Sequence, residues 1–208
     1  AHADALLYGW SPDCALRARV LEADARGTSF EVLREGGPIG RTRLSFPGRH
    51  HVLNALAALA VCRQEGLDWP VLLESLPACR PAARRFEVVL DSERLLVVND
   101  YAHHPTEIEA TLQAAEASGR RILAVFQPHR YSRTLALGDR FPAAFARAQE
   151  VILAPVYPAS EAPLDGGRLE DLERHFRAAG RTDVLACSSL DAVWYAVRRR
   201  VRPGDLLL

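Results

Sequence analysis

The chain has 208 residues, of which 49% are hydrophobic and 25% charged, and its formal net charge at pH 7 is zero. This composition is typical of a soluble globular protein, and the absence of net positive charge disfavours a nucleic-acid-binding surface. No apolar run is long enough to span a bilayer and no secretion signal is evident, which favours a cytoplasmic protein without a membrane partner.

The first 86 residues predict a small antiparallel sheet followed by helices. Short apolar runs, separated by turns rich in glycine and proline, occupy residues 6–8, 16–21, 29–33 and 39–46. Runs of this length with such turns are typical of hairpins. Apolar residues then recur at helical spacing from Arg49, and a second helix is predicted at residues 70–76. We place a domain boundary near Phe86, so that residues 1–86 form the first domain.

The first of these helices carries an unusual polar group. Asn54 follows His50 by four residues and His51 by three, so it shares a helix face with both. In one interpretation a histidine caps the helix start and Asn54 is a solvated surface residue. In the other, the carboxamide of Asn54 offers the donor and acceptor that match the Hoogsteen edge of adenine. The sequence pattern leaves both interpretations open.

Residues 87–208 predict alternating strands and helices. The strands are expected at residues 86–90, 95–98, 122–126, 151–154, 183–186 and 206–208. The helices are expected at residues 105–117, 134–148, 168–179 and 189–200. This alternation predicts a Rossmann-like, mostly parallel sheet with helices on both faces. Because consecutive parallel strands are usually neighbours, we expect strand 122–126 beside strand 95–98.

Polar clusters follow these two neighbouring strands. The first cluster contains Asp100, Tyr101, His103 and His104, and the second contains His129, Arg130 and Arg133. Ligands bind at the carboxyl ends of strands in open α/β sheets, so we expect both clusters to face one cleft. A loop rich in glycine and proline after strand 151–154 is a candidate rim for that cleft.

Two interpretations of these clusters differ in the ligand. Asp100 and the histidines offer metal ligands, but adjacent His103 and His104 should point in different directions, and the nearby arginines would repel a divalent ion. We therefore predict no metal site. Arg130 and Arg133 suit two-point contacts with a carboxylate or phosphate, and Asp100 suits an ammonium group or a ribose. An amino acid fits this set of groups; the alternative is that both clusters are solvated loops.

Two residue types limit the chemistry of the chain. All 26 basic residues are arginines, so no Walker-type phosphate loop, Schiff base or lysine general base can lie within it. The four cysteines lack C-x-x-C spacing, and we predict neither a zinc site nor a disulfide framework for Cys14, Cys62, Cys79 and Cys187.

Four motifs run in order along the chain: PGRHHVLNALAA from Pro47, RRF from Arg84, DYAHHPTE from Asp100 and FQPHRYSRT from Phe126. Together they resemble the motifs of the Mur ligases, the ATP-dependent ligases of peptidoglycan synthesis, and the last is similar to the branch that adds L-alanine. The resemblance implies a three-domain enzyme, of which this chain covers the later part of the central ATP-binding domain and most of the carboxy-terminal, amino-acid-binding domain. The missing initiator methionine and the apolar end at residues 206–208 also favour a fragment.

The resemblance implies a role for each matched residue. ATP would be bound by His50, His51, Asn54, Arg85 and Asp100. The amino acid and the muramoyl end would contact Tyr101, His103, His129, Arg130 and Arg133. The catalytic residues would be Arg85, Asp100 and His104. The family usually has asparagine where this chain has His51, which puts the role of that position in doubt.

The implied reaction joins L-alanine to UDP-N-acetylmuramate through an acyl phosphate made from ATP. The partners would therefore be these three molecules, with magnesium as a cofactor whose main ligands are expected outside this chain, and the sequence indicates no oligomeric state. Two alternatives remain, a murein tripeptide-recycling ligase and a non-catalytic module that binds a nucleotide or an amino acid.

Overall fold

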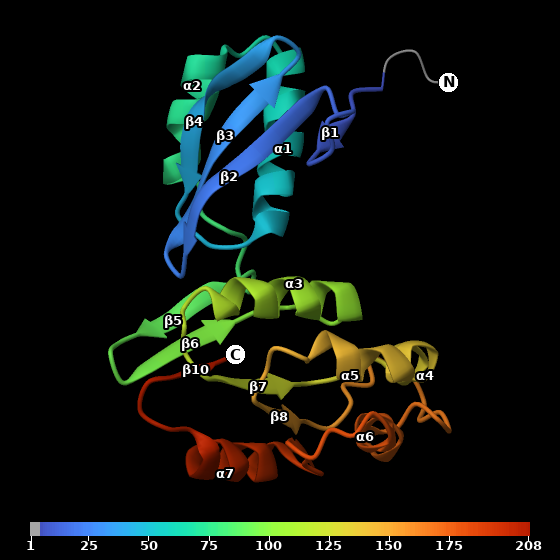
Figure 1. Ribbon diagram of the computed structural model, residues 1–208. Helices are drawn as coiled ribbons and strands as arrows, with labels where there is room; N and C mark the ends of the chain where they lie inside the picture. Colours follow the sequence, from blue (N-terminus) through green and yellow to red (C-terminus); the bar gives the residue numbers. More distant parts are fainter. Residues whose placement is uncertain (1–4) are drawn as a thin grey trace. The chain divides into compact units, whose positions relative to one another are not determined.

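The computed structural model describes residues 5–208, which form two compact units that divide between Ala82 and Ala83 (Figure 1). The predicted α/β class is confirmed, because each unit contains a sheet with helices packed on it. None of the helices formed by residues 5–208 combines the length and apolar character that crossing a bilayer requires.

The first unit is a four-stranded sheet covered by two helices. The strands lie side by side in chain order: β1 (Tyr8–Gly9), β2 (Leu16–Asp24), β3 (Gly27–Arg34) and β4 (Gly37–Leu44). They are followed by α1 (Arg49–Gln64), α2 (Trp69–Ser75) and a 3-10 turn (Leu76–Ala78). The apolar face of α1 packs on the sheet because its inward residues, among them Val52 and Leu56, meet Phe30 and Val32 of β3 in one buried core.

The prediction of a purely antiparallel sheet was wrong at its first strand. The strands β2, β3 and β4 are antiparallel as expected, but β1 runs parallel to β2, with Tyr8 opposite Leu16. Between them the Cys14 N–H donates to the Ser11 carbonyl (3.1 Å) and closes a turn. This segment carries the chain back to the start of β1 instead of reversing it as a hairpin does.

The second unit is the predicted Rossmann-like sheet. Its spatial order is β5 (Glu87–Asp91), β6 (Leu95–Asn99), β10 (Asp205–Leu207), β7 (Ile122–Phe126), β8 (Glu150–Leu153) and β9 (Val184–Ala186). Only the edge strand β5 is antiparallel to its neighbour within this sheet; the other pairings are parallel.

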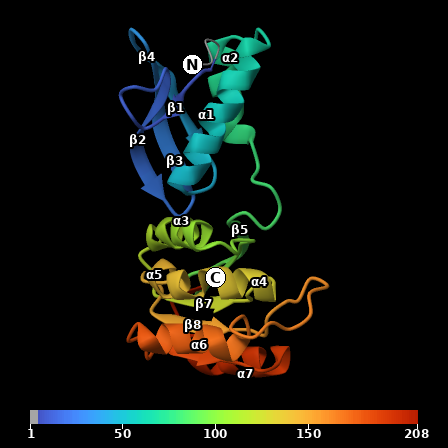
Figure 2. The ribbon, with the colours of Figure 1, turned by 90° about the vertical axis from the view of Figure 1, so that its right-hand side faces the viewer.

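Helices cover both faces of this sheet, as predicted. One core contains side chains of α3 (Pro105–Glu116), α5 (Phe141–Ala144) and α6 (Leu169–Ala178). The other contains side chains of α7 (Leu190–Arg200). Figures 1 and 2 show α3 and α7 on opposite sides of β7 and β8. Strands buried on both faces must be apolar throughout, which explains the continuous apolar runs in the sequence.

Two expectations for the second unit were wrong. The strands β6 and β7 are not neighbours, because β10 lies between them and pairs with both. The helix expected at 134–148 is instead α4 (Tyr131–Leu137), a 3-10 turn (Gly138–Arg140) and the short α5. The backbone leaves helical geometry at Leu137 (φ −126°, ψ 6°), and Pro142 has no N–H with which to continue a helix. Gly138 leaves room for His175, because an added Cβ would be 2.7 Å from its ring.

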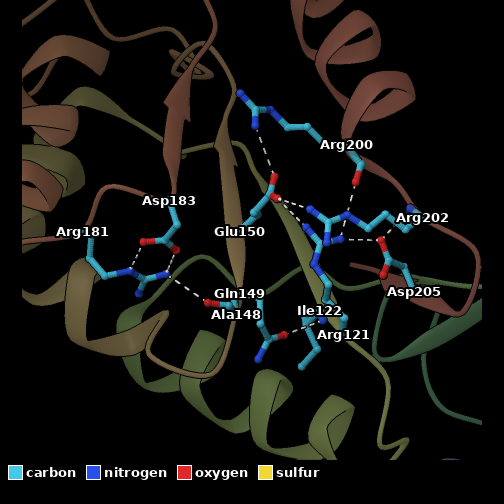
Figure 3. A network of polar contacts seen from close by, with 10 residues as sticks. All are labelled: Arg121, Ile122, Ala148, Gln149, Glu150, Arg181, Asp183, Arg200, Arg202 and Asp205. Atoms are coloured by element: carbon cyan, nitrogen blue, oxygen red, sulfur yellow. Dashed lines mark hydrogen bonds and ion pairs between the residues drawn. The ribbon is translucent and has the colours of Figure 1, made fainter.

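Charged side chains join the amino-terminal ends of the parallel strands (Figure 3). Arg121, just before β7, donates to Asp205 at the start of β10 (2.7 Å) and to Glu150 at the start of β8. Beside them Arg181 pairs with Asp183, the residue before β9. These contacts lie at the opposite end of the sheet from the two polar turns, so we assign them to holding the strands together.

Candidate functional site

A cleft of about 860 Å³ lies at the carboxyl ends of β6 and β7, within the second unit. It brings together residues of both predicted polar turns and of the loop after β8, although β10 separates the two strands. Its lining comprises Arg84, Asn99, Asp100, Tyr101, Ala102, His103, Val125, Phe126, Gln127, His129, Tyr157, Ala159 and Ser160. The structure places the other predicted residues of this unit beside the cleft and outside its lining: Arg85, His104, Arg130 and Arg133.

The backbone around this cleft is strained. Within the described part of the chain, every non-glycine residue with a left-handed φ lines or flanks it: Arg84 (58°), Phe86 (47°), Arg130 (72°), Ala159 (47°) and Ser160 (69°). Each such conformation costs about 1–3 kcal/mol and persists only where the surroundings hold it. Strain of this kind gathers at functional sites, which supports the cleft as the candidate site.

Asp100 organises the first turn. Its Oδ2 accepts a hydrogen bond from the Phe86 N–H (2.7 Å), and its Oδ1 accepts from the Ala102 N–H (2.7 Å) and the Thr111 hydroxyl (3.2 Å). The carboxylate therefore ties the end of β6 to the start of β5 and to α3. Its side chain also lines the cleft, and the expected contact with an ammonium group or a ribose stays a prediction.

The two adjacent arginines of the RRF motif differ in position. Arg84 lines the cleft, and its guanidinium lies 4.8 Å from the centre of the Tyr101 ring. The Arg84 carbonyl also accepts a hydrogen bond from the Tyr101 N–H (2.7 Å). Arg85 instead lies 3.8 Å from the Glu107 carboxylate. The sequence showed the pair but not which member faces the cleft, because that depends on the left-handed turn at Arg84.

The two adjacent histidines contact different groups. The Nδ1 of His103 lies 2.9 Å from the Tyr101 carbonyl, which can only accept, so this nitrogen carries the ring proton and Nε2 is left with a lone pair. The Nδ1 of His104 accepts a hydrogen bond from the Thr106 N–H (3.2 Å) and caps α3. His103 lines the cleft, whereas His104 belongs to the helix start.

Glu107 completes this helix cap and lies beside His103. Its Oε2 accepts from the backbone N–H groups of His103 (3.1 Å) and His104 (3.2 Å) and lies 3.6 Å from the His103 Nδ1. Burial acts to raise the pKa of Glu107, but these hydrogen bonds and the charges of His103 and Arg85 outweigh it and lower the pKa below its ordinary value. The carboxylate is therefore ionised at neutral pH.

His129 carries its proton on the opposite nitrogen. The Arg133 guanidinium, which can only donate, lies 3.2 Å from the His129 Nδ1, so the proton of the neutral ring is on Nε2. Burial and then the charge of Arg133 lower the pKa of His129, with smaller contributions from His103 and Arg130. The ring stacks on Tyr157 at 5.5 Å, and its centre lies 5.7 Å from that of His103.

The loop after β8 is bound to the second turn and forms the predicted rim. The Arg130 N–H donates to the Tyr157 carbonyl (2.8 Å), and the Glu161 carboxylate accepts from the Ser132 hydroxyl (2.6 Å) and lies 3.8 Å from the Arg130 guanidinium. The hydrogen bonds from Ser132 lower the pKa of Glu161. The sequence placed this loop, with Tyr157 and Glu161, at the correct end of the sheet as a candidate rim. It did not indicate the contacts that these two residues make, since loop contacts leave no periodic signal.

The three predicted residues of the first unit lie at the start of α1. The helix begins after Gly48, which has no side chain to cap it, so neither histidine is the N-cap residue. His51 is buried, with its ring 4.0 Å from that of His50 and 4.9 Å from that of Phe46. Asn54 is exposed, and its predicted contact with adenine stays a prediction. No group of three His, Cys, Asp or Glu side chains is placed to hold a metal ion in residues 5–208.

A family model described as "Mur ligase, glutamate ligase domain" matches residues 84–208. Curated relatives match nearly the whole chain. The UDP-N-acetylmuramate–L-alanine ligase of Oleidesulfovibrio alaskensis is 43% identical over 98% of this chain and 45% of its own length. The enzyme of that name from Symbiobacterium thermophilum is 41% identical over 98% of this chain and 42% of its own length.

A solved structure shares the fold. The crystal structure of UDP-N-acetylmuramate-alanine ligase from Thermotoga maritima superposes with a TM-score of 0.79 and 26% identity, covering 96% of this chain and 43% of that one. The chain thus spans less than half the length of these relatives.

Proposed function

Because the chain belongs to the Mur ligase family, we propose that it forms the later part of a ligase that joins L-alanine to UDP-N-acetylmuramate with the consumption of ATP. The names of relatives 41–43% identical to it support this substrate pair. In this proposal residues 1–86 complete a central ATP-binding domain, and residues 87–208 form the domain that binds the amino acid.

This proposal rests mainly on two histidines of the cleft, one of which offers a lone pair and the other an N–H. The lone pair on Nε2 of His103 can accept from an amine, and the proton on Nε2 of His129 can be donated to a carboxylate. Arg130 and Arg133 follow in the same turn and add positive charge on the carboxylate side. Tyr101 also lines the cleft, with its ring 5.0 Å from that of His103 and 6.5 Å from that of His129. An α-amino acid presents this pair of groups a few ångströms apart.

The nucleotide side of the proposal concerns residues on both units. We assign the adenine contact to Asn54, with His50 and His51 beside it, and assign contacts with the nucleotide phosphates and ribose to Arg85 and Asp100. Residues 5–208 contain no group of three His, Cys, Asp or Glu side chains that could hold a metal ion, and we expect the main ligands of the magnesium ion outside this chain.

The proposed reaction has two steps. The muramate carboxylate attacks the terminal phosphate of ATP, which gives an acyl phosphate and ADP. The amine of L-alanine then attacks the acyl carbon, and phosphate leaves as the new amide forms. Positively charged side chains beside the cleft, among them Arg85, stabilise the negative charge that develops on oxygen.

Replacement of either arginine of the second turn tests the substrate assignment. In the full-length enzyme we expect Arg130→Ala or Arg133→Ala to raise the KM for L-alanine by about tenfold or more, because each removes a charged partner of the carboxylate. The KM for ATP should change less than about twofold. Equal effects on both constants would contradict the assignment, and a preference for a tripeptide over L-alanine would favour the recycling ligase.

A further inference from the structure

The incoming amino acid raises a chemical problem that the binding contacts do not solve. At neutral pH its amine is protonated, and an ammonium nitrogen has no lone pair with which to attack an acyl carbon. A group in the cleft must therefore accept one proton before the carbon–nitrogen bond forms. That group needs a free lone pair and a neighbouring negative charge that stabilises the positive charge it acquires.

Several cleft side chains fail this requirement. Arg84 has no lone pair to offer, and both carboxylate oxygens of Asp100 accept hydrogen bonds from the protein. His129 presents an N–H at Nε2, because Arg133 occupies its Nδ1. The charge of Arg133 also opposes any further protonation of the His129 ring.

His103 meets the requirement. Its Nδ1 donates to the Tyr101 carbonyl (2.9 Å), which fixes the ring and leaves the basic lone pair on Nε2. The Glu107 carboxylate lies 3.6 Å from that Nδ1, too far for a hydrogen bond but close enough to stabilise an imidazolium electrostatically. Glu107 is itself held by two backbone N–H groups, so its charge stays in place.

We propose that His103 is the general base of the ligation step, with Glu107 as the positioning residue behind it. This inference rests on the proposed function. The Nε2 lone pair takes one proton from the ammonium group, the freed amine forms the bond to the acyl carbon, and phosphate departs with the electrons of the carbon–oxygen bond. The second amine proton passes to the departing phosphate as the tetrahedral intermediate collapses to the amide. The positive charge on His103 is balanced by Glu107.

The charged and titratable groups that face His103 come from three elements. Glu107 approaches from α3, the ring of Tyr101 lies 5.0 Å away on the same turn, and His129 approaches from the second turn. Arg85 acts indirectly, since it lies 3.8 Å from Glu107. When His103 takes up a proton, its positive charge therefore lies beside one carboxylate, that of Glu107, and one neutral ring, that of His129.

The test compares two nucleophiles in the full-length enzyme. His103→Gln keeps a side-chain donor for the Tyr101 carbonyl but has no basic nitrogen. We expect kcat with L-alanine at pH 7 to fall about 100-fold or more, the usual contribution of a general base. Hydroxylamine, whose nitrogen is already unprotonated at pH 7, should still trap the acyl phosphate as a hydroxamate at the wild-type rate. His175→Gln, a histidine on α6 outside the cleft lining, is the control and should leave both rates unchanged.

A second measurement distinguishes a general-base role of His103 from a role in substrate binding alone. The kcat of His103→Gln with L-alanine should rise about tenfold per pH unit as the free amine accumulates, whereas the wild-type rate levels off. A parallel pH profile, an equal loss with hydroxylamine, or a change in KM alone would overturn the proposal. In each of these cases an active wild-type enzyme would leave the proposed function standing.

The tautomer can be tested without activity. In the 208-residue chain the ring ¹⁵N shifts of His103 should show a protonated Nδ1 and an unprotonated Nε2, and those of His129 the reverse. A His103 protonated on Nε2 would contradict the base assignment whatever the enzyme does. A wild-type enzyme with no alanine-dependent phosphate release would instead contradict the proposed function.

Discussion

At the scale of single residues, the contact between Arg133 and His129 determines how the second turn responds to pH. Burial and the Arg133 charge lower the pKa of the folded His129, so between its folded and ordinary values the unfolded chain binds more protons. Stability from this group is therefore fully present above the ordinary pKa of 6.5 and is lost as pH falls through the folded value. Protonation also removes the acceptor that Arg133 binds.

Removal of this charge should raise the pKa of His129 part of the way to its ordinary value, because burial still lowers it. We expect Arg133→Gln to raise the pKa of His129 towards 6.5, because it deletes the largest neighbouring charge while keeping a donor of similar length. The ring proton shifts of His129, followed by NMR from pH 4 to 8, measure it. Arg130→Gln is the matched comparison, since Arg130 contributes less, and a larger rise with Arg130→Gln would contradict our account.

Residue identities in the two turns were readable from the sequence, but their protonation was not. Polar residues after two apolar runs located Tyr101, His103 and His129 at one end of the sheet. The nitrogen that carries each proton depends on a carbonyl or a guanidinium brought close by the turn itself. That geometry follows from left-handed residues such as Arg84 and Arg130, which no spacing rule marks.

At the scale of elements, the start of α3 links helix stability to the cleft. Glu107 closes the helix cap through the His103 and His104 N–H groups. Glu107→Ala should lower the free energy of unfolding by about 0.5–2 kcal/mol, the range for loss of a cap. Urea unfolding of the 208-residue chain measures this loss, which should disappear at acid pH, where protonation of the carboxyl group breaks the same contacts.

The matched control lies one half-turn along the same helix. Glu109 is exposed and lies 3.7 Å from Arg147, so Glu109→Ala should change the unfolding free energy by less than about 1 kcal/mol. Similar losses for Glu107→Ala and Glu109→Ala would show that helix propensity, and not the cap, is responsible.

Element types were largely predictable from the pattern, whereas their pairing was not. The apolar run of β10 resembles that of any buried strand, so nothing local indicates that it enters between β6 and β7. The break between α4 and α5 was missed for a related reason. Helical periodicity continues through Gly138 and Pro142, and nothing local marks Leu137 as the residue where the backbone leaves helical geometry.

At the scale of the whole second unit, Arg121 joins strands that are distant in the chain. Arg121 is the charged partner of Asp205, which is only 2% exposed. Arg121→Ala should therefore lower the free energy of unfolding by about 3–5 kcal/mol, the cost of leaving one charge of a buried pair unpaired. The titration of His129 at the other end of the sheet should not change.

Arg147 provides a matched control for this prediction. It pairs with Glu116 (3.2 Å) and Glu109 (3.7 Å), but both acids are largely exposed, so Arg147→Ala should cost less than about 1 kcal/mol. Denaturant unfolding of both variants makes the comparison, and equal losses would contradict the role assigned to Arg121.

The central place of β10 has a consequence for biosynthesis. A ribosome completes both polar turns about 70 residues or more before it adds Asp205–Leu207, yet these residues separate and pair with the two strands that carry the turns. Nascent chains fold progressively from the amino terminus, and long-range strand pairing is slow. The cleft should therefore mature late, and until β10 emerges the growing polypeptide exposes two unpaired strand edges that a chaperone can recognise.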